Sequence, residues 1–392
     1  MLTLKRLFFL ILIIFIILIV LGLIVYQQQK TLGNNSKVDI NRYVLNQMLS
    51  CHQNGLAPPA CFKQAASEIR GKFALKDILS VIEQNQNQPE IFQTCHEMTH
   101  FLGREEYQRT KELGGALNKC TPVCFAGCYH GVLEGYLIEK NLSSNSGDDS
   151  VIAKEVSTLC GRKEDYDQNE LYNQCLHGLG HALMFLAEND LPRSLKFCDE
   201  FKTAPDQEWC YSGAFMENST SSTNQDHPSK YLKADDPMYP CTILDEKYLN
   251  MCYALQSFYF AEVTGYDWNK TIALCNQVPG LYQATCFRSI GQNLVGFTQE
   301  LKTIKKNCNL ITESELEKAC IQGAVLALSS KYNGDYSKIT EFCLLVDAEN
   351  KKICYSQMGI SMKDWVTDPQ RLESICFSIA KKEDREFCLK PE

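Results

Sequence analysis

The sequence predicts an all-α fold: an α-solenoid of about ten disulfide-stapled helical hairpins that follows one N-terminal transmembrane helix. Two observations predict it. One is an almost unbroken apolar run near the N-terminus, and the other is a set of 20 cysteines that recur at regular intervals along the remaining chain. Because so many cysteines form disulfides in an oxidising compartment, the membrane segment and the cysteine content fit together.

The apolar run covers residues 7–26, LFFLILIIFIILIVLGLIVY, and as a helix it is long enough to cross about 30 Å of hydrocarbon. Lys5 and Arg6 precede it, so residues 1–6 are expected to stay in the cytoplasm while the rest crosses the bilayer. A cleaved signal peptide is the alternative, but the run exceeds the usual core of about 7–15 residues and no small-residue cleavage site follows. We therefore expect a single-pass membrane protein with an uncleaved signal-anchor and an extracytoplasmic bulk.

The polar stretch Gln27–Lys37 has no apolar period, so residues 27–45 are expected to form a flexible tether. Residues 46–392 then form an extracytoplasmic helical-repeat domain, for which 45% hydrophobic residues supply a core. The chain carries a net charge of −8 and has no long run of lysine or arginine. It therefore lacks the basic surface of a nucleic-acid-binding protein.

Two columns of cysteines define the repeat. In the first, successive intervals are 34, 33, 47, 35, 42, 34, 34, 34 and 34 residues. Its members are Cys61, Cys95, Cys128, Cys175, Cys210, Cys252, Cys286, Cys320, Cys354 and Cys388. The second column precedes the first by 8 to 15 residues and contains Cys51, Cys120, Cys160, Cys198, Cys241, Cys275, Cys308, Cys343 and Cys376. The longer intervals mark loop insertions, which the polar stretches 141–150 and 219–230 supply.

The pattern within a repeat is helix–turn–helix. Ile272 and Cys275 form a short apolar stripe, Pro279-Gly280 interrupts it, and Cys286 begins a second stripe with apolar residues at i+4 and i+8. An aspartate eight residues before the second-column cysteine is placed to cap a first helix of about two turns. These aspartates are Asp190, Asp267, Asp335 and Asp368.

A disulfide between the two columns would join the helices of each hairpin, and a closed loop of about 12 residues contributes roughly 3 kcal/mol. Cys95 has no upstream mate and Cys124 is surplus, so these two are expected to pair with each other. Residues 121–122, Thr-Pro, match an N-cap followed by proline at the first helical position, which would put Cys124 and Cys128 on one helix face. Exchange to a pair between Cys120 and Cys124 is the alternative.

A period of 34 residues built from helical hairpins resembles the tetratricopeptide and Sel1-like repeat families, over nearly all of residues 46–392. The tetratricopeptide signature W-x2-L-G-x2-Y is absent, and the stapling cysteines depart from it. The resemblance implies a solenoid with a concave binding face and specifies no particular ligand. We expect a protein or peptide partner on that face. Tyr253 and residues 258–260 are candidates for an aromatic binding stripe there, and the alternative is that they pack in the core.

Five of the seven histidines lie between residues 96 and 181 and recur in three consecutive repeats. Each repeat places two candidate ligands four residues apart: His96 with His100, His130 with Glu134, and His177 with His181. Residues so spaced share a helix face, and neighbouring helices pack close enough to bring the three pairs into one site. Zinc is the expected metal, with iron, copper and nickel as alternatives. The competing interpretation is structural: the imidazoles hydrogen-bond carbonyls where glycines let helices approach.

His96-Glu97-Met98-Thr99-His100 also matches H-E-x-x-H and so resembles the zincin metallopeptidases. By that resemblance His96 and His100 would be zinc ligands and Glu97 the catalytic base. The resemblance to metzincins ends at Glu106, where that group has a third histidine. The leading hypothesis is therefore a membrane-anchored binding or scaffold protein with a histidine-rich metal site, and the alternative is a zinc-dependent hydrolase.

Overall fold

The computed structural model describes residues 40–51, 59–86, 88–139, 149–220, 229–332 and 335–391. Within these ranges the chain folds into helices and turns, without strands, which confirms the predicted all-α class. The predicted transmembrane helix at residues 7–26 and the first part of the tether lie outside the described residues. No helix within the described ranges is long and apolar enough to span a bilayer.

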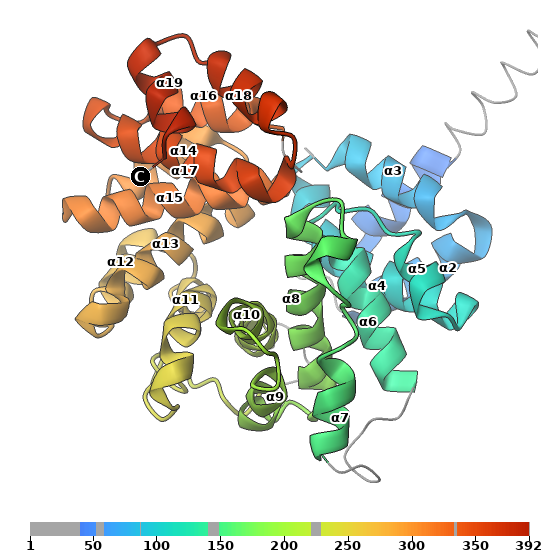
Figure 1. The fold of residues 1–392 in the computed structure, drawn as a ribbon. Coiled ribbons are helices and arrows are strands. Elements are labelled where there is room, and N and C mark those ends of the chain that lie inside the picture. Colours follow the sequence, from blue (N-terminus) through green and yellow to red (C-terminus); the bar gives the residue numbers. More distant parts are fainter. Residues whose placement is uncertain are drawn as a thin grey trace, which may run out of the picture.

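The described chain forms a series of helical hairpins in which the second helices pack against one another in sequence order (Figure 1). The second helices are α2 (Pro59–Lys72), α4 (Pro89–Thr110), α6 (Gly127–Glu139), α8 (Asn169–Leu186), α10 (Ala204–Thr220), α11 (Glu246–Val263), α13 (Gly280–Phe297), α15 (Ser314–Lys331), α17 (Lys351–Trp365) and α19 (Lys382–Leu389). The first helices are a helix over residues 40–51, α3 (Leu75–Asn85), α5 (Leu113–Leu117), α7 (Asp149–Val156), α9 (Leu191–Cys198), α12 (Trp268–Cys275), α14 (Leu301–Cys308), α16 (Ser337–Leu345) and α18 (Pro369–Phe377). The turns of residues 229–245 take the place of a first helix before α11.

Three of the short first helices, α9, α12 and α18, begin directly after the aspartates that predict them, and α16 begins two residues after Asp335. The carboxylate of Asp190 accepts a hydrogen bond from the backbone N–H of Arg193, and the other three aspartates accept from backbone N–H groups two or three residues downstream. These bonds satisfy amide groups that have no partner inside the helix. Helices α9, α12 and α14 are each 8 residues long, as expected for about two turns.

All 20 cysteines form disulfides, with Cα–Cα distances of 5.5 to 5.8 Å. The pairs are Cys51–Cys61, Cys95–Cys124, Cys120–Cys128, Cys160–Cys175, Cys198–Cys210, Cys241–Cys252, Cys275–Cys286, Cys308–Cys320, Cys343–Cys354 and Cys376–Cys388. Nine of them close loops within a single hairpin. The tenth, Cys95–Cys124, links α4 to the segment before α6. These are the pairs that the two columns predict.

The repeat domain begins earlier than residue 46. Residues 40–45, expected to belong to the tether, form the first half of the helix over residues 40–51. Val44, Met48 and Cys51 lie on one face of this helix and are fully buried. This apolar face continues the core of the next hairpins, so the segment is helical although its upstream neighbours are polar.

The expectation of a helix start at Thr121-Pro122 is wrong. Residues 121–126 form turns, and α6 begins at Gly127. Cys124, Phe125 and Ala126 have φ angles of 55°, 55° and 59°, so three successive residues with side chains adopt the left-handed conformation. Each such residue costs roughly 1–2 kcal/mol, and strained backbone of this kind concentrates at functional sites. The Cys95–Cys124 disulfide holds this turn against α4.

The helical array curves until its two halves touch, and α17 packs beside α8 (Figure 1). The side-chain amide of Gln299 donates a hydrogen bond to the carbonyl oxygen of Gln86 at 3.1 Å. Nearby, Nζ of Lys331 at the end of α15 lies 3.4 Å from the centre of the Phe92 ring in α4. We call these contacts the closure contact. An open solenoid, as the repeat families imply, would leave the two halves apart.

The aromatic residues proposed as a binding stripe are mostly buried. Tyr253 and Tyr259 are 3% and 5% exposed, and Phe260 is fully buried. Phe258 packs against the same core. Their burial agrees with the alternative interpretation, in which these rings fill the interior of the array.

Candidate metal centre

Three pairs of second helices make the same close contact, each through two facing glycines. They are α4 and α6 through Gly103 and Gly131, α8 and α10 through Gly180 and Gly213, and α13 and α15 through Gly291 and Gly323. A Cβ atom on the second glycine of each pair would collide with the carbonyl oxygen of His100, His177 or Arg288, respectively. These three residues therefore occupy equivalent positions, three residues before the first glycine of each pair.

This contact explains why Cys95 has no mate in its own hairpin. His177 follows its column cysteine by two residues, and Arg288 does the same, whereas His100 follows Cys95 by five. Helix α4 is thus shifted by three residues relative to the cysteine column. Because the shift moves Cys95 away from the end of its hairpin, it pairs with the left-handed turn before α6 instead.

Five histidines from α4, α6 and α8 form one group, which we call the histidine cluster: His96, His100, His130, His177 and His181. Neighbouring ring centres in it are 4.6 to 5.5 Å apart. His96 is half-buried and the other four are no more than 8% exposed. Sequence reasoning predicts this convergence, and the structure brings all five rings together.

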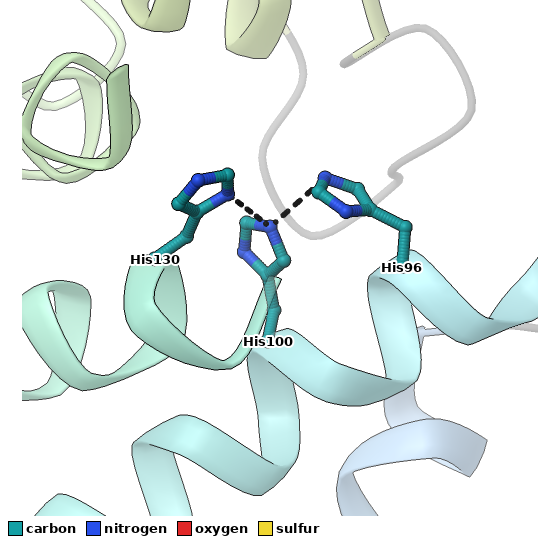
Figure 2. Close-up of side chains that lie close together, drawn as sticks. All are labelled: His96, His100 and His130. Atoms are coloured by element: carbon teal, nitrogen blue, oxygen red, sulfur yellow. Dashed lines mark hydrogen bonds between the residues drawn. The ribbon is translucent and has the colours of Figure 1, made fainter. Parts of the chain in front are cut away.

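The rings of His96 and His100 from α4 and of His130 from α6 point toward one another (Figure 2). Nε2 of His100 lies 3.2 Å from Nε2 of His96 and 3.2 Å from Nδ1 of His130. One nitrogen from each ring falls within 4.8 Å of the other two. Zinc–nitrogen bonds of 2.0–2.1 Å in a tetrahedron place ligand nitrogens about 3.3–3.4 Å apart. The two separations of 3.2 Å around Nε2 of His100 are close to this distance.

Hydrogen bonds on the far side of each ring set the tautomers of the α4 histidines. Nδ1 of His96 lies 2.7 Å from the carbonyl oxygen of Cys124, and Nδ1 of His100 lies 2.8 Å from a carboxylate oxygen of Glu134. Since both oxygens only accept, each Nδ1 carries the proton and each Nε2 presents a lone pair to the centre. Arg104 fixes the second oxygen of Glu134 at 2.6 Å.

The tautomer of His130 is set by a similar relay. Nε2 of Gln174 donates to Glu170 at 2.7 Å, so Oε1 of Gln174 is left to accept a hydrogen bond from Nε2 of His130 at 3.3 Å. The proton of His130 is then on Nε2, and Nδ1 faces the α4 pair with its lone pair. In Figure 2 the nitrogens of His96 and His130 both face Nε2 of His100.

Burial controls the protonation of the cluster. Removal from water, together with the neighbouring His100, lowers the pKa of His96 to about 3. Burial also holds the pKa of His130 and of His177 well below the usual range, with the other histidines adding to the effect. For Glu134, burial alone would raise the pKa, but Arg104 and His100 outweigh it and keep that pKa below its usual range. The centre thus places neutral imidazoles of His96, His130 and His177 beside an ionised carboxylate.

The second histidine pair, His177 and His181 in α8, has its own partners. Its two Nε2 atoms are 3.1 Å apart. Nδ1 of His177 lies 2.6 Å from Oγ of Ser212, and Nδ1 of His181 lies 2.8 Å from a carboxylate oxygen of Glu217. Ser212 and Glu217 both lie on α10.

Glu97 lies next to His96 on α4 and is partly exposed. Burial raises the pKa of its carboxyl group to about 7; His100 lowers this pKa and Glu217 raises it. Its carboxyl group makes no hydrogen bond or ion pair among the described residues. Glu106, at the third metzincin position, is turned away from the cluster and pairs with Arg70 and Lys119.

Of the residues expected as ligands, the five histidines converge and Glu134 lies behind His100 as its hydrogen-bond acceptor. The competing interpretation, in which the imidazoles hydrogen-bond backbone carbonyls, applies among these five rings only to His96. Sequence reasoning missed Ser212, Glu217 and the carbonyl of Cys124. A signal for the first two exists: the acceptors follow their histidines by 34 to 36 residues, one repeat, because they lie on the next second helix.

Comparisons with protein-family models, curated proteins and solved structures find no match for this chain. The resemblance to tetratricopeptide and Sel1-like repeats therefore rests on the repeat length and the helical hairpins, and the zincin resemblance rests on the H-E-x-x-H motif.

Proposed function

We propose that this protein is a membrane-anchored, extracytoplasmic helical-repeat protein that binds a divalent transition-metal ion through His96, His100 and His130. The observation that carries the proposal is the group of three ring nitrogens within 4.8 Å, each presenting a lone pair. Two nitrogen lone pairs about 3 Å apart repel each other unless a proton or a metal ion lies between them. Bound metal would remove this repulsion at both short nitrogen–nitrogen contacts of His100.

The remainder of the proposal rests on the chain around the site. Ten disulfides indicate an oxidising compartment, and the apolar run at residues 7–26 with Lys5 and Arg6 before it supports an anchor in that orientation. With every cysteine in a disulfide, thiolate ligands are absent and the donor set consists of imidazoles. Imidazole suits zinc, copper, nickel and iron. Three protein ligands leave a fourth position for water or a substrate, as in catalytic zinc sites.

Metal analysis of the full chain tests this proposal. The protein would be purified in detergent with its disulfides intact, loaded with Zn²⁺, dialysed, and measured by elemental mass spectrometry. We expect stoichiometric zinc in the native chain and loss of at least one ion in His100→Ala. Arg288→Ala is the matched control, since Arg288 holds the equivalent position in α13. Zinc content that is negligible, or equal in all three proteins, would refute the site.

A metal-dependent hydrolase is a second candidate, and Glu97 is the observation that favours it. Its partly exposed carboxyl group has no partner among the described residues and lies between the two α4 ligands along the chain. Such a group can accept a proton from a water molecule. Zinc-loaded protein would be assayed against a peptide library: Glu97→Gln should keep its zinc and lose hydrolysis. Hydrolysis that persists in Glu97→Gln would defeat the enzyme hypothesis and leave the metal site intact.

A further inference from the structure

We propose that His177 and His181 bind a second metal ion, so that the histidine cluster is a two-ion centre. The inference rests on the proposed function, because the second ion would lie beside the first in the same cluster. It assigns separate roles to the two pairs: His96 and His100, with His130, hold one ion, and the α8 pair holds the other.

The first argument is the state of the ring nitrogens in the α8 pair. Oγ of Ser212 donates its only proton to the carbonyl oxygen of Trp209 at 2.7 Å, so it can only accept from Nδ1 of His177. The carboxylate of Glu217 accepts from Nδ1 of His181. Both protons are therefore on Nδ1, and the two Nε2 lone pairs face each other at 3.1 Å. With both rings neutral, this close contact sets two acceptors face to face, which is the arrangement of two ligands of one ion.

The second argument is that the α8 pair repeats the construction of the α4 pair. In both, two histidines four residues apart present Nε2 to each other, and in both each Nδ1 has an acceptor outside the pair. Such acceptors orient metal-binding histidines and raise their basicity. In each pair one acceptor is a carboxylate one repeat downstream, Glu134 for His100 and Glu217 for His181.

The third argument separates the second ion from the first. His130 adjoins both pairs, with ring centres 5.1 Å from His100 and 5.3 Å from both His177 and His181, and the pairs also meet directly at 5.4 Å between His100 and His181. Its lone pair at Nδ1 faces His100, while its Nε2 donates to Gln174. His130 can therefore serve only the first ion. The second ion would have two imidazole ligands and more open positions, which suits it to bind water or an anionic group of a substrate.

Counting ions tests the inference. The full chain in detergent would be titrated with Zn²⁺ and its bound metal measured after dialysis. We expect two ions in the native chain and in Arg288→Ala, and one in His181→Ala. Ser212→Ala should fold normally and lower the binding affinity for one of the two ions by about 10- to 100-fold, because it removes only the acceptor behind His177.

Electron paramagnetic resonance of the Cu²⁺-loaded chain gives a second readout. Two adjacent copper ions should broaden each other's signals in the native chain, and His181→Ala should show the sharp spectrum of an isolated ion. One ion in the native chain that is unaffected by His181→Ala would overturn the second site and leave the proposed function standing. One ion that is lost in both His100→Ala and His181→Ala would mean that the five rings share a single site, which also overturns the inference. Absence of any bound metal would refute the proposed function itself.

Discussion

Two helix contacts in the N-terminal half, α4–α6 and α8–α10, share one backbone arrangement with the α13–α15 contact in the C-terminal half. The side chains at these contacts differ between the two halves. In all three, facing glycines let the helices touch, and a side chain three residues before the first glycine meets one that immediately precedes the second. In the N-terminal half these meetings are His100 with His130 and His177 with Ser212, at 3.2 and 2.6 Å. In the C-terminal half Arg288 meets Gln322 at 3.4 Å, exposed to solvent. Each repeat thus places two side chains in contact at the same point of the helix pair, and the identity of those side chains decides whether the contact can bind a ligand.

The largest expected effect tests the shared backbone. Gly213→Val and Gly323→Val should each lower the free energy of unfolding by about 3 kcal/mol, because the new side chain collides with a backbone carbonyl that cannot move independently of its helix. Denaturant titration followed by circular dichroism measures both. Only Gly213→Val should also reduce zinc binding, since His177 lies at its contact. Equal zinc loss in both variants would show that the glycines act on the fold alone.

A smaller effect is expected at the acceptor behind His100. Glu134→Gln keeps the shape of the side chain but removes the charge that holds the ring, so zinc affinity should fall about 10- to 100-fold, or roughly 1.4–2.7 kcal/mol. Competition with a chromophoric chelator measures the affinity. Gln322→Glu in the C-terminal contact is the control and should leave zinc affinity unchanged. An unchanged affinity in Glu134→Gln would indicate that Glu134 serves only to neutralise Arg104.

The closure contact, where the two halves meet, gives a pH-dependent prediction. Burial lowers the pKa of Lys331 from 10.5 to about 7 in the folded chain. Between pH 7 and pH 10.5 the unfolded chain therefore binds more protons at this residue, so its contribution to the stability of the fold rises with pH. Lys331→Met should stabilise the protein on the order of 1 kcal/mol at pH 6, because Nζ is buried without a hydrogen-bond partner. The gain should shrink by pH 9, as followed by thermal unfolding, and a pH-independent gain would contradict the assigned cause.

Only a weak gain of zinc binding is expected from placing histidines at the equivalent positions of the C-terminal half. Arg288→His combined with Gln322→His copies the meeting of His100 with His130, but the contact is exposed and lacks an acceptor comparable with Glu134. We expect zinc binding there to be about 100-fold weaker than in the native cluster. Isothermal titration on a background of His100→Ala and His181→Ala would isolate the new site. Affinity equal to the native cluster would show that the acceptors matter little.

Much of the fold is predictable because cysteine spacing records hairpin geometry. The pairing of Cys275 with Cys286 follows from an interval that fits a short helical hairpin. Convergence of the histidines is predictable for a similar reason, since residues four apart share a helix face. Neither argument identifies which side chains of the next helix accept hydrogen bonds from these rings. The acceptor Glu217 lies on a neighbouring helix, so a search within one helix does not find it.

The left-handed turn at residues 124–126 was also beyond prediction. No glycine marks it, and left-handed geometry at residues with side chains is unfavourable on its own. The Cys95–Cys124 disulfide and the hydrogen bond from His96 to the carbonyl of Cys124 hold it in place. The closure contact is equally hidden, since it joins residues such as Gln86 and Gln299 that are far apart in sequence. It follows from the accumulated curvature of many repeats, which no single repeat encodes.

The locality of the disulfides has a mechanical consequence for the molecule. Every covalent cross-link joins residues within one hairpin or two adjacent ones, and the closure contact contains none. Disulfides therefore cross-link the array along its course, whereas the two halves meet at the closure contact through noncovalent interactions. Separating the two halves would therefore require no disulfide to be reduced, and an oxidising environment would not prevent it.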